Sequence, residues 1–133
     1  MSAVVVDTDV CSYFFKKDTR ARLYHPHLVG RTPILSFMTA AELYYWALQR
    51  GWGPARRDRL DRHLLGYQVH SADDLLCRLW AEVTHGAGRR GRKIDGADAW
   101  IAATALALGI PLVTHNAADY AGVDGLTVLS AAP

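Results

Sequence analysis

Cysteine is scarce in this sequence, with only Cys11 and Cys77 in 133 residues. The two are far apart and lack the short spacing of zinc-binding pairs, which argues against a zinc-finger or disulfide-rich class. Both fall at apolar positions of predicted helices. We therefore expect two buried free thiols, as in a protein of a reducing compartment.

Long uninterrupted apolar runs are absent as well. The longest, Ala99 to Val113, is broken by Thr104, Gly109 and Pro111, which excludes it as a membrane span. The N-terminal stretch has few basic residues and no small-residue cleavage pattern, so we expect no secretory signal. Together these absences predict a cytoplasmic protein without a membrane partner.

Neither sign of charge dominates. Lys and Arg number 15 against 13 Asp and Glu, and the pI is near 8.7. This balance is too even to indicate a nucleic-acid-binding protein by itself. Half of the residues are hydrophobic, which is enough for a substantial core, and the length fits one domain over residues 1–133.

Short apolar segments alternate with helical patterns along the whole chain. Strands are expected at 4–6, 33–37, 67–70, 110–114 and 126–130, and helices at 9–17, 20–28, 39–51, 53–66, 72–86 and 95–109. The strands lack the polar alternation of a half-exposed sheet, which indicates burial on both faces. The sequence therefore predicts an α/β fold with a mostly parallel sheet between helical layers.

Two carboxylates, Asp7 and Asp9, follow the first apolar strand directly in "AVVVDTDV". We interpret Asp9, with Thr8, as the cap of the next helix. Asp7 is harder to explain as a cap, because it follows directly on buried Val6. Ligands of open α/β sheets bind at the carboxyl ends of strands, so Asp7 is a candidate functional residue.

Other acidic residues are predicted at the same edge of the sheet, and each also has an ordinary structural explanation. Thr39 and Glu42 form a capping-box pattern. Asp95 could cap the helix that follows it, where the helix dipole would favour Asp98. Asn116 and Asp119, past the "LVT" strand, are common turn formers.

The shared location of these acids favours a functional interpretation. Two unit charges ~4 Å apart repel by about 4 kcal/mol at an effective dielectric of 20, so a fold gathers them only with protons or a cation. Carboxylates without Cys or well-placed His suit Mg²⁺ or Mn²⁺. Such ions typically serve phosphate chemistry.

Several motifs together resemble those of PIN-domain ribonucleases of the VapC toxin type. The motifs are "VVVDTDV", "SFMTAAELYYWA", "DAWIAATALALGIPLVTHNAADY" and "GLTVLS". They cover nearly the whole chain in order. The resemblance implies a three-layer α/β/α fold with four or five strands and RNA cleavage that depends on Mg²⁺ or Mn²⁺. It also implies a homodimer and neutralisation by a cognate VapB antitoxin.

The resemblance also implies a set of site residues. The matching metal ligands are Asp7, Glu42 and Asp98. A fourth acid usually follows the "LVT" strand; this chain has Asn116 at one common position, and we favour Asp119, three residues later. In the hypothesised mechanism these four residues are catalytic, and Thr114 and Asn116 orient water or a phosphate oxygen. Asp95 is either a cap or an outer partner.

Two basic segments accompany these acids. "GRRGRK" supplies Arg89, Arg90, Arg92 and Lys93 on an expected loop that leads to Asp98, and we interpret these four as RNA contacts rather than as a solvated loop. In contrast, "RRDRLDRH" interleaves arginines with Asp58 and Asp61 at helical pair spacings. That pattern indicates an ion-paired surface or a face toward a partner.

Three other functions stay open at this point. "DTDV" also resembles the first motif of haloacid-dehalogenase-type phosphatases, in which Asp7 would be a nucleophile. A degenerate PIN fold could serve as a binding scaffold, although Asp7, Glu42 and Asp98 are intact. An RNA-processing PIN nuclease without a toxin role is the third alternative. A short adjacent reading frame for a small DNA-binding protein would favour the toxin.

Overall fold

The computed structural model describes residues 2–131, and its centre is a five-stranded sheet. The strands are β1 (Ala3–Val6), β2 (Thr32–Ser36), β3 (Gln68–His70), β4 (Leu112–Val113) and β5 (Val128–Leu129). They lie in the order β3-β2-β1-β4-β5, and every neighbouring pair is parallel. The predicted parallel α/β fold is confirmed; Met1 and residues 132–133 of the predicted domain lie outside the described residues.

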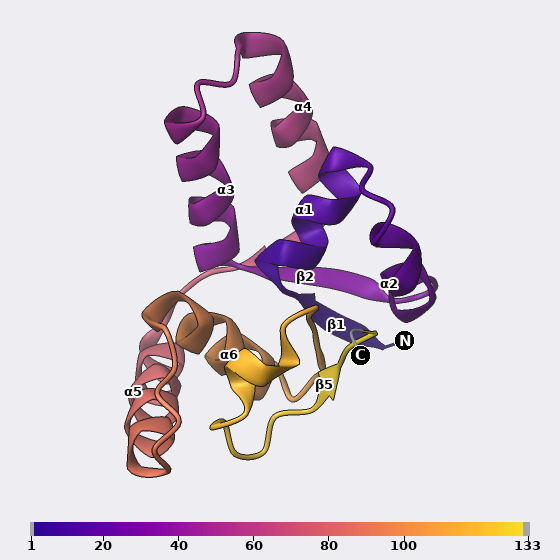
Figure 1. Ribbon diagram of the computed structural model, residues 1–133. Coiled ribbons are helices and arrows are strands. Elements are labelled where there is room, and N and C mark those ends of the chain that lie inside the picture. Colours follow the sequence, from indigo (N-terminus) through magenta and orange to yellow (C-terminus); the bar gives the residue numbers. More distant parts are fainter. Residues whose placement is uncertain (1, 132–133) are drawn as a thin grey trace.

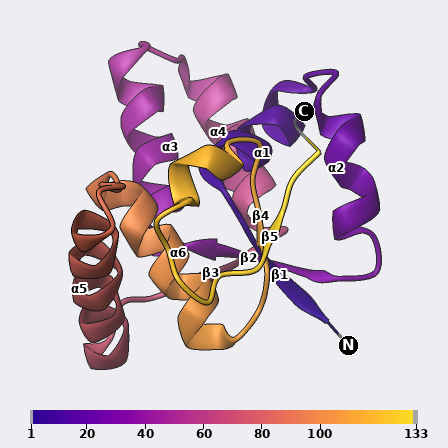
Figure 2. The ribbon, with the colours of Figure 1, turned by 60° about the horizontal axis from the view of Figure 1, so that its bottom comes forward.

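Helices cover both faces of this sheet (Figure 1). They are α1 (Thr8–Lys16), α2 (Ala21–Leu28), α3 (Phe37–Gln49), α4 (Pro54–Leu64), α5 (Asp74–Arg89) and α6 (Gly96–Leu108), with a short 3₁₀ turn η1 (Ala117–Tyr120) after β4. In both views α5 and α6 lie on one side of the sheet, and α1, α3 and α4 lie on the other (Figure 2). This is the expected three-layer α/β/α arrangement.

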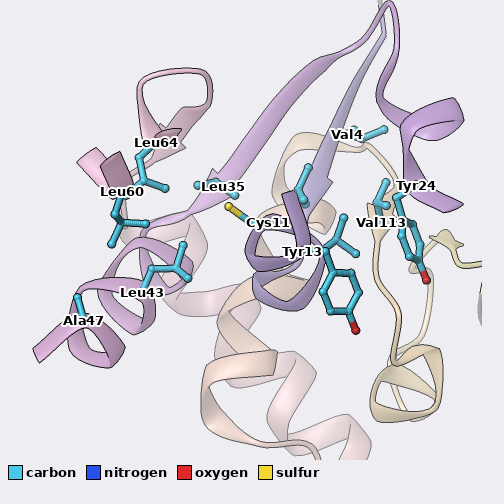
Figure 3. Close-up of a cluster of buried hydrophobic side chains, with 12 residues drawn as sticks. Val4, Cys11, Tyr13, Tyr24, Leu35, Leu43, Ala47, Leu60, Leu64 and Val113 are labelled. Atoms are coloured by element: carbon cyan, nitrogen blue, oxygen red, sulfur yellow. The ribbon is translucent and has the colours of Figure 1, made fainter. Parts of the chain in front are cut away.

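The central strand β1 divides the core into two parts. Val4 and Val6 pack in a cluster with α1 to α4, whereas Val5 packs with α5 and α6. This follows from the alternation of side chains along a strand. Figure 3 shows the first cluster, in which Leu43 of α3 and Tyr24 of α2 are among the fully buried residues. Burial on both faces fixes β1, and with it the position of Asp7 at its carboxyl end.

Several local predictions are wrong. Helix α3 begins at Phe37, with Ser36 as its cap through a 3.1 Å bond from the Met38 N–H, so Thr39 and Glu42 are not a capping box. Ser36 and Thr39 both carry a hydroxyl group suited to capping, and Ser36 is the one that stands at the end of the strand. Helix α5 continues to Arg89, so Gly88 and Arg89 of the expected "GRRGRK" loop are helical. Cys11 is buried as expected, but Cys77 is exposed.

None of the helices within residues 2–131 is both long enough and apolar enough to cross a membrane.

Candidate active site

The acidic residues predicted from the sequence meet at the carboxyl edge of the sheet. One pocket there is lined by Asp7, Thr8, Asp9, Glu42, Trp46, Asp98, Asn116 and Asp119. They come from the end of β1, from α1, α3 and α6, and from the segment after β4. The fold thus brings the four proposed catalytic acids to one pocket, although they are far apart in the sequence.

Asp7 is the most deeply buried of these acids, with 6% of its surface exposed. One carboxylate oxygen accepts the Thr8 N–H at 2.7 Å, and Asp7 is therefore the N-terminal cap of α1. The other oxygen accepts hydroxyl hydrogen bonds from Thr114 at 2.7 Å and Tyr120 at 2.9 Å. Three donors thus hold this carboxylate in one orientation at the pocket.

Asp9 is not the cap that the sequence suggested. Its carboxylate accepts bonds from the Val10 N–H at 2.7 Å, from the His115 N–H at 3.2 Å and from the Asn116 side-chain amide at 2.8 Å. The cap position is already taken by Asp7, since α1 begins one residue earlier than expected. Asp9 instead ties the segment after β4 to the start of α1.

Glu42 reaches the pocket from α3. Its Oε1 accepts the Thr8 hydroxyl at 2.8 Å, and the Thr8 oxygen lies 2.9 Å from the buried Thr39 hydroxyl. Since Thr8 has one hydroxyl hydrogen and gives it to Glu42, Thr39 is left to donate to Thr8. The hydrogen bonds from Thr39 to Thr8 and from Thr8 to Glu42 hold the Glu42 carboxylate at the pocket.

Asp98 is placed by the small residues of α6. Ala99, Ala102 and Ala103 are fully buried, which lets this helix pack closely and brings its first turn to the pocket. Asp95 caps α6 by accepting the Ala97 N–H at 3.2 Å, so its interpretation as a cap is confirmed. The Tyr120 hydroxyl lies 3.3 Å from Asp98 Oδ1 as well as 2.9 Å from Asp7 Oδ2, and it links the two carboxylates.

The remaining predicted residues divide between the pocket and its surroundings. Thr114 is buried and directed at Asp7, while Asn116 is exposed and bonded to Asp9. Asp119, in η1, is exposed at the pocket. Tyr120, which the sequence analysis did not single out, contacts two of the predicted ligands; its only sequence signal is its place at the end of "NAADY".

The predicted RNA-binding residues have different surroundings. Arg92 and Lys93 line a neighbouring pocket together with Asp98 and Asp119. Arg90 donates to the Gly122 carbonyl at 3.0 Å and lies 3.7 Å from Asp124, contacts that hold the C-terminal segment. Arg89 ends α5 as an exposed residue. Arg92 and Lys93 are therefore the two that the fold brings nearest to the acids.

Known proteins share both this fold and the sequence pattern. The family model described as "PIN domain" matches residues 4–126. The chain belongs to the PIN-domain family. Ribonuclease VapC5 of Mycobacterium tuberculosis is 28% identical over 126 residues, which cover 93% of this chain and 90% of that protein.

Solved structures give the same fold for this PIN domain. VapBC2 of Rickettsia felis, bound to a DNA fragment from its promoter, aligns with a TM-score of 0.85 at 21% identity over 96% of this chain and 98% of that one. VapBC-5 of M. tuberculosis, described as a member of the VapBC family of toxin–antitoxin systems, aligns with a TM-score of 0.73 at 26% identity over 100% of both chains.

Burial and mutual repulsion perturb the acids of this PIN domain. Burial, with the nearby charge of Asp9, raises the pKa of Asp7 to about 7. Burial and the charges of Asp119 and Asp95 raise the pKa of Asp98 to about 6. Burial also raises the pKa of Glu42 above its usual range. The folded protein thus disfavours the charged forms of these carboxyl groups when no cation compensates them.

The donor set fits a hard divalent cation. Within residues 2–131 no three Asp, Glu, His or Cys side chains stand in a ready-made metal geometry, and the Tyr120 hydroxyl bridges Asp7 and Asp98. All of the candidate ligands nevertheless carry carboxylate oxygens, which Mg²⁺ and Mn²⁺ prefer. A cation near Asp7, Glu42 and Asp98 would compensate the burial and the repulsion that raise their pKa values.

The raised pKa of Asp7 predicts a measurable pH dependence of stability. Asp7 keeps its proton in the folded protein at pH values where the unfolded chain, with a pKa near 3.8, has lost it. The free energy of unfolding of the metal-free protein should therefore fall as the pH rises from about 4 to about 7. Asp7→Asn removes this titration. The difference between the melting temperature of the variant and that of wild type should therefore be larger, in favour of the variant, at pH 8 than at pH 5.

Thermal melts of both proteins in EDTA at the two pH values measure this difference. Histidine residues also titrate in this pH range, but they are the same in both proteins, so their effect drops out of the difference in melting temperature. An equal difference at pH 5 and pH 8 would contradict the proposed protonation of Asp7.

Proposed function

We propose that this PIN domain is an Mg²⁺- or Mn²⁺-dependent endoribonuclease and the toxin of a VapBC-type toxin–antitoxin pair. The observation that carries the proposal is the meeting of Asp7, Glu42, Asp98 and Asp119 in one pocket at the carboxyl edge of a parallel sheet. Ligands of such sheets bind at this edge. The name of the relative, ribonuclease VapC5, supports RNA as the substrate.

In this proposal each residue of the site has a separate role. Asp7, Glu42 and Asp98 hold the metal, and Asp119 contributes from the exposed side. When bound, the ion supplies a Lewis acid that stabilises phosphate charge and acidifies water. Thr114 keeps Asp7 in place through its 2.7 Å bond, and Asn116 offers its amide to a phosphate oxygen or a water molecule. Arg92 and Lys93 bind the RNA backbone beside Asp98.

The partners are proposed from the relatives. The similar structures from R. felis and M. tuberculosis are described as VapBC, which supports a VapB-type antitoxin as the partner of this chain. We propose a homodimer that acts in the cytoplasm on RNA. Growth arrest on expression, relieved by the product of an adjacent short gene, would distinguish a toxin from an RNA-processing PIN nuclease.

Metal removal tests the proposed activity directly. The purified protein should cut a single-stranded RNA with Mg²⁺ or Mn²⁺, and EDTA should abolish the cleavage because the carboxylates alone cannot stabilise phosphate charge. Added Mn²⁺ should restore it. Gel analysis of a labelled RNA measures both steps. Cleavage that persists at the same rate in EDTA would refute the metal-dependent mechanism.

A further inference from the structure

Three cations lie near one another at one end of α1, of α3 and of α4, and the opposite ends of α1 and α3 contribute to the acidic pocket. Lys16 ends α1, Arg50 follows α3 as its C-terminal cap, and Arg56 lies in the first turn of α4. Partial burial lowers the pKa of Lys16, the charges of Arg50 and Arg56 lower it further, and Asp18 acts in the opposite direction, so both arginines lie close enough to repel Lys16. Among residues 2–131, ion pairs form at four other arginines, and none includes these three cations.

Helix dipoles explain only part of this group. Cations are stabilised at the C-terminal ends of helices, which accounts for Lys16 and Arg50. Arg56 stands at the opposite end of its helix, where the dipole disfavours a cation and no acidic residue occupies the first turn. Its guanidinium lies 4.0 Å from the centre of the Trp52 ring and 6.0 Å from that of Phe15. Aromatic faces thus hold Arg56 and leave its charge uncompensated.

This cationic group is connected to the acidic pocket along two helices. On α1, Thr8 lies at the pocket and Lys16 two turns away; on α3, Glu42 and Arg50 have the same spacing, roughly 12 Å. The Thr8–Glu42 hydrogen bond joins the two helices at the pocket end. Both helices thus lead from the pocket end to the basic end.

Trp46 lies between the two ends. It lines the acidic pocket, and the Arg50 guanidinium lies 5.1 Å from the centre of its ring. Half-buried aromatic rings alternating with unpaired cations are the combination by which proteins bind single-stranded nucleic acid without reading its sequence. On this side of the pocket, the cations at the basic end are the groups that can attract further backbone phosphates.

We propose that Lys16, Arg50 and Arg56 bind the backbone phosphates of a single-stranded RNA segment next to the bond in the acidic pocket, with Trp46 holding Arg50 in position. This inference rests on the proposed ribonuclease function and adds a binding track on the α1–α3 side, opposite Arg92 and Lys93. An RNA must extend beyond the pocket to reach it. The track therefore contributes to the affinity for long RNA and not to the chemical step.

Salt dependence of RNA binding tests this track. We would measure the anisotropy of a labelled single-stranded 20-mer in the Asp7→Asn background, which prevents cutting, at several salt concentrations. Each lost phosphate contact lowers the slope of log K against log[salt] by ~0.7 for single strands. Arg50→Gln should lower it by about that amount, and Lys16→Gln with Arg50→Gln by ~1.4. Arg50→Lys keeps the charge and should keep the slope.

The matched control is Arg78→Gln, which removes one exposed cation on α5, where Arg78 pairs with Asp74. It should leave the slope unchanged. In the cleavage-competent protein, Arg50→Gln should raise KM for the 20-mer and leave kcat near wild type. Thermal melts check that the exposed substitutions leave the fold intact.

The outcomes separate this inference from the proposed function. Wild-type cleavage with an unchanged slope and KM in Arg50→Gln overturns the track and leaves the ribonuclease standing. If Arg50→Gln instead weakens binding of a poly-glutamate peptide and not of RNA, the cations serve an acidic protein partner and the track is overturned. A wild-type protein that neither binds nor cuts RNA overturns both.

Discussion

Asp98→Asn is expected to lower Mg²⁺-dependent RNA cleavage by at least about 100-fold and, at the same time, to raise the melting temperature of the metal-free protein. Loss of an outer partner of a metal ligand typically costs 10–100-fold, and loss of a ligand should exceed this. Stability should rise because the raised pKa of Asp98, about 6, shows that the fold disfavours its charged form. Opposite changes in activity and stability are the signature of a functional acid.

Initial cleavage rates and thermal melts in EDTA at pH 8 measure the two effects. Asp74→Asn is the matched control, because Asp74 is an exposed acid on α5 that pairs with Arg78. It removes the same charge and should leave the cleavage rate unchanged. If Asp98→Asn cleaves RNA at the wild-type rate, Asp98 is not part of the active site. If its melting temperature falls, the loss of activity is explained by a damaged fold.

The parallel sheet and the edge that carries the site could be predicted from the sequence because both follow from local patterns. Apolar runs without polar alternation indicate a buried parallel sheet, and the carboxyl ends of its strands share one edge. Asp7 is placed by this rule alone, since it follows Val6 directly. Asp98 is placed by the alanine-rich face of α6, which is visible in "DAWIAATALA". The fold and these two acids therefore needed no knowledge of distant contacts.

The caps of α1 and α3 could not be predicted, because several suitable residues lie within one turn of each other. Ser36 and Thr39 both carry a hydroxyl, and the local pattern with Glu42 favours Thr39. Ser36 is the cap, and Thr39 lies inside the helix with its hydroxyl oxygen 2.9 Å from that of Thr8. Asp7 and Asp9 present the same problem at the start of α1. Contacts between segments far apart in the sequence override local preference in both cases.

Tyr120 and the cationic track were missed for a related reason. Tyr120 ends a turn, and nothing in its neighbourhood shows that its hydroxyl reaches Asp7 at the other end of the chain. Lys16, Arg50 and Arg56 belong to three helices, and each alone is an ordinary surface cation. Only the folded arrangement shows that they are neighbours and that none of the ion pairs within residues 2–131 includes them.

Tyr120→Phe should weaken Mn²⁺ binding by roughly 10–100-fold, the usual cost of removing an outer partner of a metal ligand. The Tyr120 hydroxyl donates to Asp7 at 2.9 Å, and this bond lowers the pKa of Asp7 against the effect of burial. Without it, Asp7 keeps its proton to higher pH and competes less well for a cation. The aromatic ring stays, so the buried cluster around Val5 and Leu112 should keep its packing.

Calorimetric titration with Mn²⁺ at pH 7 and at pH 8.5 distinguishes this explanation from a general loss of structure. If the proton on Asp7 is the competitor, the deficit of Tyr120→Phe should shrink at pH 8.5, where that proton is lost in both proteins. Tyr67→Phe is the matched control: it removes a half-buried hydroxyl that lies 3.4 Å from His63, and its Mn²⁺ affinity should equal that of wild type. A Tyr120→Phe protein with unchanged affinity at pH 7 would show that Asp7 does not depend on this hydroxyl. A deficit of the same size at both pH values would show that Tyr120 acts on the shape of the pocket and not on the charge of Asp7.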